Sequence, residues 1–238
     1  NAVILSPEHK MKVSLRSPMM IPRVALVDPE LTRTLPPEVT ASTGMDAFVQ
    51  LIEPYVSPRA NPITDGFCRE GLGRISRNLL SAYRDGEDMV AREDMGLASL
   101  LGGMAFANAG LGAVHGFASP IGGMFDAPHG AICASLLVSV TQANVKALKQ
   151  QDPSSPILAR YEEIARLITG NPRATIEAGI DWMRKLVSDL GITGLGALGV
   201  SAANIPIIVD LATQASSMRI NPVALSKDEL AEILVQSL

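Results

Sequence analysis

Two of the three histidines in this sequence, His115 and His129, stand close together in the chain, on either side of a run rich in glycine and proline. Neutral imidazole is the most common protein ligand for transition metals, and it is also the side chain that titrates near physiological pH. Two imidazoles that meet could therefore bind a metal ion or transfer a proton. This segment is the first candidate site.

Proline and glycine between the two histidines predict that they belong to different elements. Pro120, Gly122, Gly123 and Pro128 lie between them. One continuous helix from 115 to 129 is therefore disfavoured, and we expect no long helix between the two positions. His115 and His129 then share a site only if the fold brings them together. The alternative is structural, with His115 at the end of a helix and His129 in a loop.

A second group of candidate ligands comes from an earlier segment. Residues 43–53 predict one helix, whose apolar side is formed by Met45, Phe48, Val49 and Ile52. Asp46 and Gln50 are spaced i, i+4 and lie one turn apart on the same face. A carboxylate, an amide oxygen and two imidazoles make a mixed O/N site suited to iron or zinc. Alternatively, Asp46 is a carboxylate in a first turn that complements the helix dipole.

Cysteine usage favours reduced thiols. The sequence has two cysteines, Cys68 and Cys133, without the paired spacing of a structural metal site. Buried thiols are the expectation, rather than a disulfide or a nucleophile. Cys133 follows His129 by four residues, so a thiol ligand at that position is an open alternative.

The remaining pattern divides the chain into a short β-rich start and a helical body. Residues 2–5, 12–15 and 24–27 are predicted as strands within a segment that spans 1–35. The predicted helices cover 38–56, 62–84, 90–110, 129–149, 157–169, 175–190, 203–217 and 227–237. Ser226 before Asp228 and Glu229 is typical of a helix N-cap with acids in the first turn.

Composition excludes several classes of protein. The chain has 238 residues, of which 47% are hydrophobic and 18% charged, enough for a sizeable core. A net charge of −4, without a basic patch, argues against a nucleic-acid partner. We also predict that no apolar run is long enough to cross a membrane, and nothing resembles a targeting peptide. A cytoplasmic setting is the default.

Several motifs together resemble the iron-containing (group III) alcohol dehydrogenases. The stretches that match this family, in order, are Gly44-Met45-Asp46-Ala47, His115, Pro120-Ile121-Gly122 and Pro128-His129-Gly130. The segments 27–31 and 107–112 and the pair Asn221-Pro222 agree as well. The resemblance covers the whole chain. The run 122–129 also looks like the maleylacetate reductase branch of the same superfamily.

The resemblance implies a metal site with two departures. Asp46, His115 and His129 match family ligands, whereas the remaining ligand, a histidine in the family, falls on Gln50. A neutral amide oxygen is a weaker donor than imidazole, so the occupancy by Fe²⁺ or Zn²⁺ is expected to be partial or absent unless the ion is supplied. Hydride transfer with weak or no metal stays an alternative. A further family histidine of the active-site cleft falls on Ser119, so Gln50 and Ser119 are the candidate catalytic residues.

The resemblance also implies NAD or NADP, held mainly by a preceding domain. The family places a lysine near the cofactor at the position of Lys12, although an exposed strand lysine is the structural alternative. No Gly-x-Gly-x-x-Gly follows a strand, and the glycine-rich run 191–199 is typical of a helix C-cap and loop. We therefore expect the C-terminal portion of a longer enzyme, with little NAD(P)H affinity or activity as an isolated chain.

These expectations define the predicted fold and function. The fold is mainly α, the multi-helix C-terminal domain of the dehydroquinate synthase-like/iron-containing alcohol dehydrogenase fold. Residues 1–35 would be a β-rich remnant of the cofactor domain, and residues 36–238 the metal and substrate domain. The implied activity is NAD(P)-dependent, metal-assisted oxidation of an alcohol or reduction of a carbonyl compound by a homodimer, with no nucleic-acid or membrane partner. The alternatives are a maleylacetate reductase and a catalytically inert folding or dimerisation module.

Overall fold

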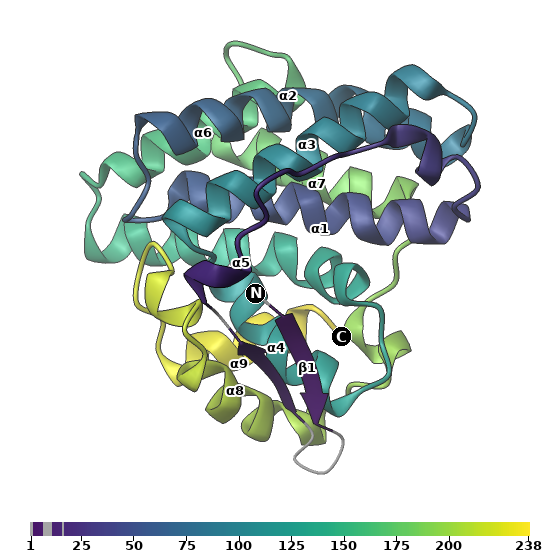
Figure 1. Cartoon of the computed structure of the whole chain (residues 1–238). Helices are drawn as coiled ribbons and strands as arrows, with labels where there is room; N and C mark the ends of the chain where they lie inside the picture. Colours follow the sequence, from purple (N-terminus) through teal and green to yellow (C-terminus); the bar gives the residue numbers. More distant parts are fainter. Residues whose placement is uncertain (1, 7–10, 16) are drawn as a thin grey trace.

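A computed structural model describes residues 2–6, 11–15 and 17–238 of the chain (Figure 1). The chain starts with an antiparallel hairpin of β1 (Ala2–Ser6) and β2 (Met11–Leu15), in which Ala2 pairs with Leu15 and Ser6 with Met11. The third predicted strand, at 24–27, does not form. Its backbone pairs with no strand among the described residues, and Val24 and Leu26 are largely exposed.

The body of the molecule is helical, as predicted. Its α-helices are α1 (Pro37–Val56), α2 (Pro62–Arg84), α3 (Met89–Ala109), α4 (Ala113–Met124), α5 (His129–Gln151), α6 (Pro156–Thr169), α7 (Ile176–Asp189), α8 (Ile205–Gln214) and α9 (Lys227–Gln236). The helix predicted at 203–217 is shorter than expected, because a 3-10 turn at Ala202–Asn204 precedes α8 and the chain becomes extended at Ala215.

The helix α4 corrects the sequence analysis, which placed no helix between the two histidines. This segment forms a helix even though Pro120 lies inside it. Val114, Phe117 and Ile121 are fully buried along one side of α4. Helix stability in proteins comes mostly from packing of an apolar face, and here that packing outweighs the low intrinsic propensity. The predicted break is present, but it comes later, at residues 125–128.

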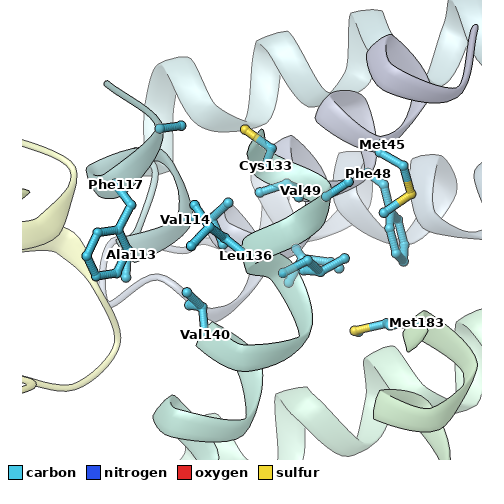
Figure 2. Close-up of a cluster of buried hydrophobic side chains, with 14 of the residues drawn as sticks. Met45, Phe48, Val49, Ala113, Val114, Phe117, Cys133, Leu136, Val140 and Met183 are labelled. Atoms are coloured by element: carbon cyan, nitrogen blue, oxygen red, sulfur yellow. The ribbon is translucent and has the colours of Figure 1, made fainter. Parts of the chain in front are cut away.

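Helices α1 and α5 lie at the centre of the packing. Helix α1 contacts α2, α3, α5 and α6, and α5 contacts α4, α6, α7 and α9. In Figure 1, α2, α3 and α6 lie on one side of α1, whereas α4, α8, α9 and the hairpin lie on the opposite side. Figure 2 shows the buried cluster between these helices, with Phe48 from α1 and Leu136 from α5. The middle of α1 and the starts of α4 and α5 are thereby brought to one place.

Helix α5 also corrects the prediction that no run is long enough to cross a membrane. It has 23 residues and a mean hydropathy of 1.4 over its most apolar window, so its length and composition would suffice. The bent pair α3 and α4 passes the same test together. Yet 67% of the α5 window is buried within the protein. The apolar residues of α5 are accounted for by its central place in the core.

Candidate metal centre

Asp46 and Gln50 lie next to each other on α1, one turn apart. The predicted apolar positions of this helix, Met45, Phe48, Val49 and Ile52, are all buried. Within residues 44–56 of α1, Asp46 and Gln50 are the two that are not fully buried. The Nε2 amide group of Gln50 donates a hydrogen bond of 2.8 Å to Asp46 Oδ2. The other carboxylate oxygen, Asp46 Oδ1, is directed towards the histidines.

His115 lies in the first turn of α4, and distant side chains hold that turn. The N-cap, Gly112, provides no side-chain cap. Asn221 Oδ1 accepts a hydrogen bond of 3.1 Å from the N–H of Ala113, and Glu53 Oε1 accepts one of 2.7 Å from the N–H of Val114. The first N–H groups of a helix have no partners within the helix itself. These two residues therefore fix the start of α4 and the position of His115.

Glu53 also orients the His115 ring. Glu53 Oε2 lies 2.7 Å from His115 Nδ1, and both side chains are buried, with exposures of 6% and 8%. Since a carboxylate accepts, Nδ1 carries the proton and donates it to Glu53. The other ring nitrogen, Nε2, then points to Asp46 Oδ1 at 3.2 Å. A carboxylate behind a metal-binding histidine is a common arrangement, which fixes the ring and raises its basicity.

The start of α5 supplies His129 and Cys133. His129 Nε2 lies 3.6 Å from Asp46 Oδ1, and Cys133 Sγ lies 3.7 Å from His129 Nε2. The two imidazole rings have centroids 5.5 Å apart. One ligand atom from each of Asp46, His115, His129 and Cys133 can be chosen so that all lie within 4.8 Å of one another. The two histidines therefore come from different helices and converge.

Gly130 allows α5 to approach α1 closely enough for this convergence. A Cβ atom at Gly130 would lie 1.9 Å from the carbonyl oxygen of Ser42, a backbone atom of α1. No real Cβ contact is that short, so a side chain at this position would push the two helices apart. The glycine that follows His129 thus has a steric role, which is to bring that histidine next to Asp46.

The electrostatics of the group favour a bound cation. Burial alone lowers the pKa of His115, but the charge of Glu53 and the hydrogen bonds that the ring donates to Asp46 and Glu53 outweigh it and raise the pKa to about 9. Burial alone raises the pKa of Asp46, but the His115 hydrogen bond and the charges of both histidines lower it overall. Without a metal, a proton on His115 therefore supplies positive charge between the two carboxylates.

Two polar atoms of the group test whether a metal fits. Asp46 Oδ1 and His115 Nε2 are both buried and lie 3.2 Å apart. Without a proton on Nε2, His115 gives Asp46 Oδ1 no hydrogen bond, and buried polar atoms without partners are rare and costly. A divalent cation between them would satisfy both atoms, and carboxylate, imidazole and thiolate are donors that zinc and iron accept. The residues present therefore fit a metal.

The remaining predicted residues, Ser119 and Lys12, make no side-chain hydrogen bond with the group that the structure describes. Ser119 is half-buried on α4, one turn after His115. Lys12 belongs to β2, but its side chain lies outside the described part of the chain, as does all of His9. Sequence reasoning missed the roles of Glu53 and Asn221. A glutamate within the apolar stretch of α1 was the available signal for Glu53.

Two surface hollows do not coincide with the group. Their volumes are about 420 and 260 Å³, and both are lined by Gln142 and Gln236. The lining positions of α5, among them Ser135 and Val138, lie on the side of that helix opposite Cys133, given about 100° of rotation per residue. The candidate metal centre is thus separate from both hollows.

The described part of the chain is thus a protein of the α class whose helices bring a carboxylate and two imidazoles together. Residues 40–238 match the model of the Fe-containing alcohol dehydrogenase family, C-terminal. The chain belongs to this family.

Relatives with known names agree with this assignment. Alcohol dehydrogenase 4 of Saccharomyces cerevisiae is 36% identical over 98% of this chain and 59% of its own length. The 1,3-propanediol dehydrogenase of Klebsiella pneumoniae is 36% identical over 100% of this chain and 60% of its own. The chain thus spans about three fifths of these relatives' length.

Solved structures share the fold. The crystal structure of a 1,3-propanediol oxidoreductase superposes with a TM-score of 0.81 at 36% identity, covering 89% of this chain and 55% of that one. An archaeal halo-thermophilic alcohol dehydrogenase from a Red Sea brine pool gives a TM-score of 0.91 at 29% identity, covering 100% and 60%. The predicted helical fold of the iron-containing alcohol dehydrogenases is confirmed.

Proposed function

We propose that this chain is the metal- and substrate-binding portion of an NAD(P)-dependent alcohol dehydrogenase, with Asp46, His115 and His129 as ligands of one Fe²⁺ or Zn²⁺ ion. The observation that carries the proposal is the convergence of three helices on Asp46 Oδ1 and His115 Nε2, two buried atoms 3.2 Å apart, with His129 and Cys133 beside them. Such a metal, when bound, polarises the oxygen of an alcohol or carbonyl substrate as a Lewis acid.

The chain's own residues prepare the site for that chemistry. Glu53 holds the Nδ1 proton of His115, so that Nε2 is presented to the ion. Gln50 donates to Asp46 Oδ2 and directs Oδ1 towards the ion. The fully buried side chains of Met45 on α1 and Ile121 on α4 exclude water from the core of the helices that carry the group. Ser119, one turn from His115, is proposed to face the substrate cleft.

The nicotinamide cofactor completes the proposal. NAD or NADP supplies or accepts the hydride, and we propose that Lys12 lies near it. Residues 1–35 would then belong with the cofactor-binding part, and residues 36–238 with the metal and substrate part. The substrates would be small alcohols and their aldehydes or ketones, by analogy with relatives named for 1,3-propanediol and methanol. A homodimer in the cytoplasm is the proposed setting.

The experiment measures metal binding. The purified protein is stripped with a chelator and titrated with Zn²⁺, or with Fe²⁺ under anaerobic conditions. We expect one ion per chain, whereas NAD(P)H formation from primary alcohols should stay low in this chain. Asp46→Asn should lose the ion, whereas the matched change Asp126→Asn, at an exposed carboxylate outside the group, should keep it. Stoichiometric metal binding by Asp46→Asn would contradict the proposal.

A further inference from the structure

We propose that the Cys133 thiolate is the fourth protein ligand of the metal, so that the centre is built from one oxygen, two nitrogens and one sulfur. This inference rests on the proposed function, because it assigns a ligand to the same ion. It departs from the resemblance, which puts the remaining ligand at Gln50. Figure 2 shows Cys133 on α5, in one buried cluster with Val49 and Phe48 of α1.

Three of the distances between the donor atoms are close to those of a four-coordinate site. Ligand atoms at the corners of a tetrahedron with bonds of about 2.0–2.3 Å, as in zinc sites, are about 3.3–3.8 Å apart. In the protein, Asp46 Oδ1 lies 3.2 Å from His115 Nε2 and 3.6 Å from His129 Nε2. Cys133 Sγ lies 3.7 Å from His129 Nε2. All three separations are close to the tetrahedral range before any ion is bound.

The secondary structure explains why the sulfur reaches the group. His129 and Cys133 are spaced i, i+4 on α5, so both project from the same face of the helix. That face meets α1 at the close contact between Gly130 and Ser42. The two buried atoms Asp46 Oδ1 and His115 Nε2 complete the group. Four donors from three helices therefore lie within 4.8 Å of one another.

The Gln50 amide already makes a hydrogen bond to Asp46. Its NH₂ group donates to Asp46 Oδ2 at 2.8 Å, so a nitrogen that cannot bind a metal faces the carboxylate. Gln50 is therefore a positioning residue for Asp46. The ligand that the resemblance expects from α1 is supplied by sulfur from α5 instead.

Thiolate coordination has chemical consequences. When the divalent ion binds, the Cys133 S–H bond breaks, a metal–sulfur bond forms and one proton passes to solvent, with no change in oxidation state. Thiolate and imidazole ligands suit zinc well, whereas carboxylates suit harder ions. We therefore expect Zn²⁺ to bind more tightly than Mn²⁺ or Mg²⁺ by a wide margin.

The test uses the purified protein loaded with Co²⁺, a spectroscopic substitute for Zn²⁺. A thiolate ligand gives an intense sulfur-to-cobalt charge-transfer band in the near ultraviolet, and four-coordination gives strong visible bands. We expect both in the unaltered protein. Cys133→Ser should lose the near-ultraviolet band and weaken metal binding by more than about 10-fold. Cys68→Ser, the same change at the other buried thiol, should keep the band.

Two further measurements keep the test valid if the Cys133 variant misfolds. The double variant Cys133→Ser/Gln50→His offers the family's imidazole and should recover metal binding without the charge-transfer band. X-ray absorption of the unaltered protein with Zn²⁺ needs no variant, and it should detect one sulfur at about 2.3 Å from zinc.

The outcomes separate this inference from the proposed function. If Co²⁺ binds with no charge-transfer band and zinc has only nitrogen and oxygen neighbours, Cys133 is not a ligand, and the three-ligand site stands. If the band survives in Cys133→Ser, the inference is likewise overturned. If neither Co²⁺ nor Zn²⁺ binds at all, the proposed metal site fails together with it.

Discussion

The two halves of the candidate metal centre are held in different ways. The inner half comprises His115, Glu53 and the first turn of α4, and the outer half comprises His129 and Cys133 at the start of α5. The His115 side chain is 8% exposed and bonded to a buried carboxylate, whereas that of His129 is 40% exposed. The α4 turn is capped by Glu53 and Asn221, whereas the N-cap of α5, Pro128, makes no side-chain cap.

The difference indicates that the two halves contribute to metal binding in different ways. The inner half is set by buried hydrogen bonds that form when the chain folds, so it is ready before a metal arrives. The outer half depends on close backbone packing at Gly130 and on the metal itself. Preorganised ligands reduce the cost of binding, while a more exposed ligand leaves a route for the ion.

The largest loss of unfolding free energy is expected at the contact between α1 and α5 that joins the two halves. Gly130→Ala puts a methyl group against the Ser42 carbonyl oxygen, a backbone atom that cannot turn aside. We expect a loss of more than about 3 kcal/mol in unfolding free energy and loss of metal binding, measured by urea denaturation and calorimetry. Gly66→Ala on α2 is the control, since nothing lies within 4 Å there, and it should be neutral or stabilising. Equal behaviour of the two variants would refute the steric role of Gly130.

The inner half is tested by Glu53→Gln. The amide keeps one acceptor, so either the Val114 N–H or the His115 Nδ1–H loses its partner inside the core. We expect about 1–3 kcal/mol of destabilisation, measured by urea denaturation. Metal affinity should fall by about 10–100-fold, because the ring of His115 loses its orienting carboxylate. Unchanged affinity would show that Glu53 has no part in presenting His115.

The pH dependence of stability also reports on the inner half. The pKa of His115 is raised from 6.5 to about 9 in the folded metal-free protein. Its contribution to stability is therefore complete below pH 6.5 and is lost as pH rises to about 9. Thermal unfolding of the metal-free protein should show Tm falling across this window, and His115→Gln should remove the fall. A Tm that is flat across the window in the unaltered protein would contradict the charged state of His115.

The outer half should hardly affect the metal-free protein. His129→Ala removes a partly exposed side chain, so the unfolding free energy should change by no more than about 0.5 kcal/mol. Metal affinity, by contrast, should fall sharply, because a ligand is lost. Thermal unfolding with and without Zn²⁺ measures both quantities. A large destabilisation without metal would abolish the distinction between the two halves.

The sequence predicted much of this arrangement and failed at identifiable points. The positions of Asp46 and Gln50 followed from helix periodicity, which is a local property. Helix α4 was missed because its glycines and Pro120 lower local propensity, whereas its stability comes from tertiary burial. Glu53 was missed because its partner, His115, lies 62 residues away in the sequence. No local pattern indicates which buried carboxylate meets which histidine.

The most direct measurement is anomalous X-ray diffraction at the zinc edge from crystals of the protein loaded with Zn²⁺. A single strong peak in bonding contact with Asp46, His115 and His129 is the predicted result, with the ion between Asp46 Oδ1 and His115 Nε2. A peak at another place, or full zinc loading with no peak among these three residues, would contradict the central claim that α1, α4 and α5 form one metal centre.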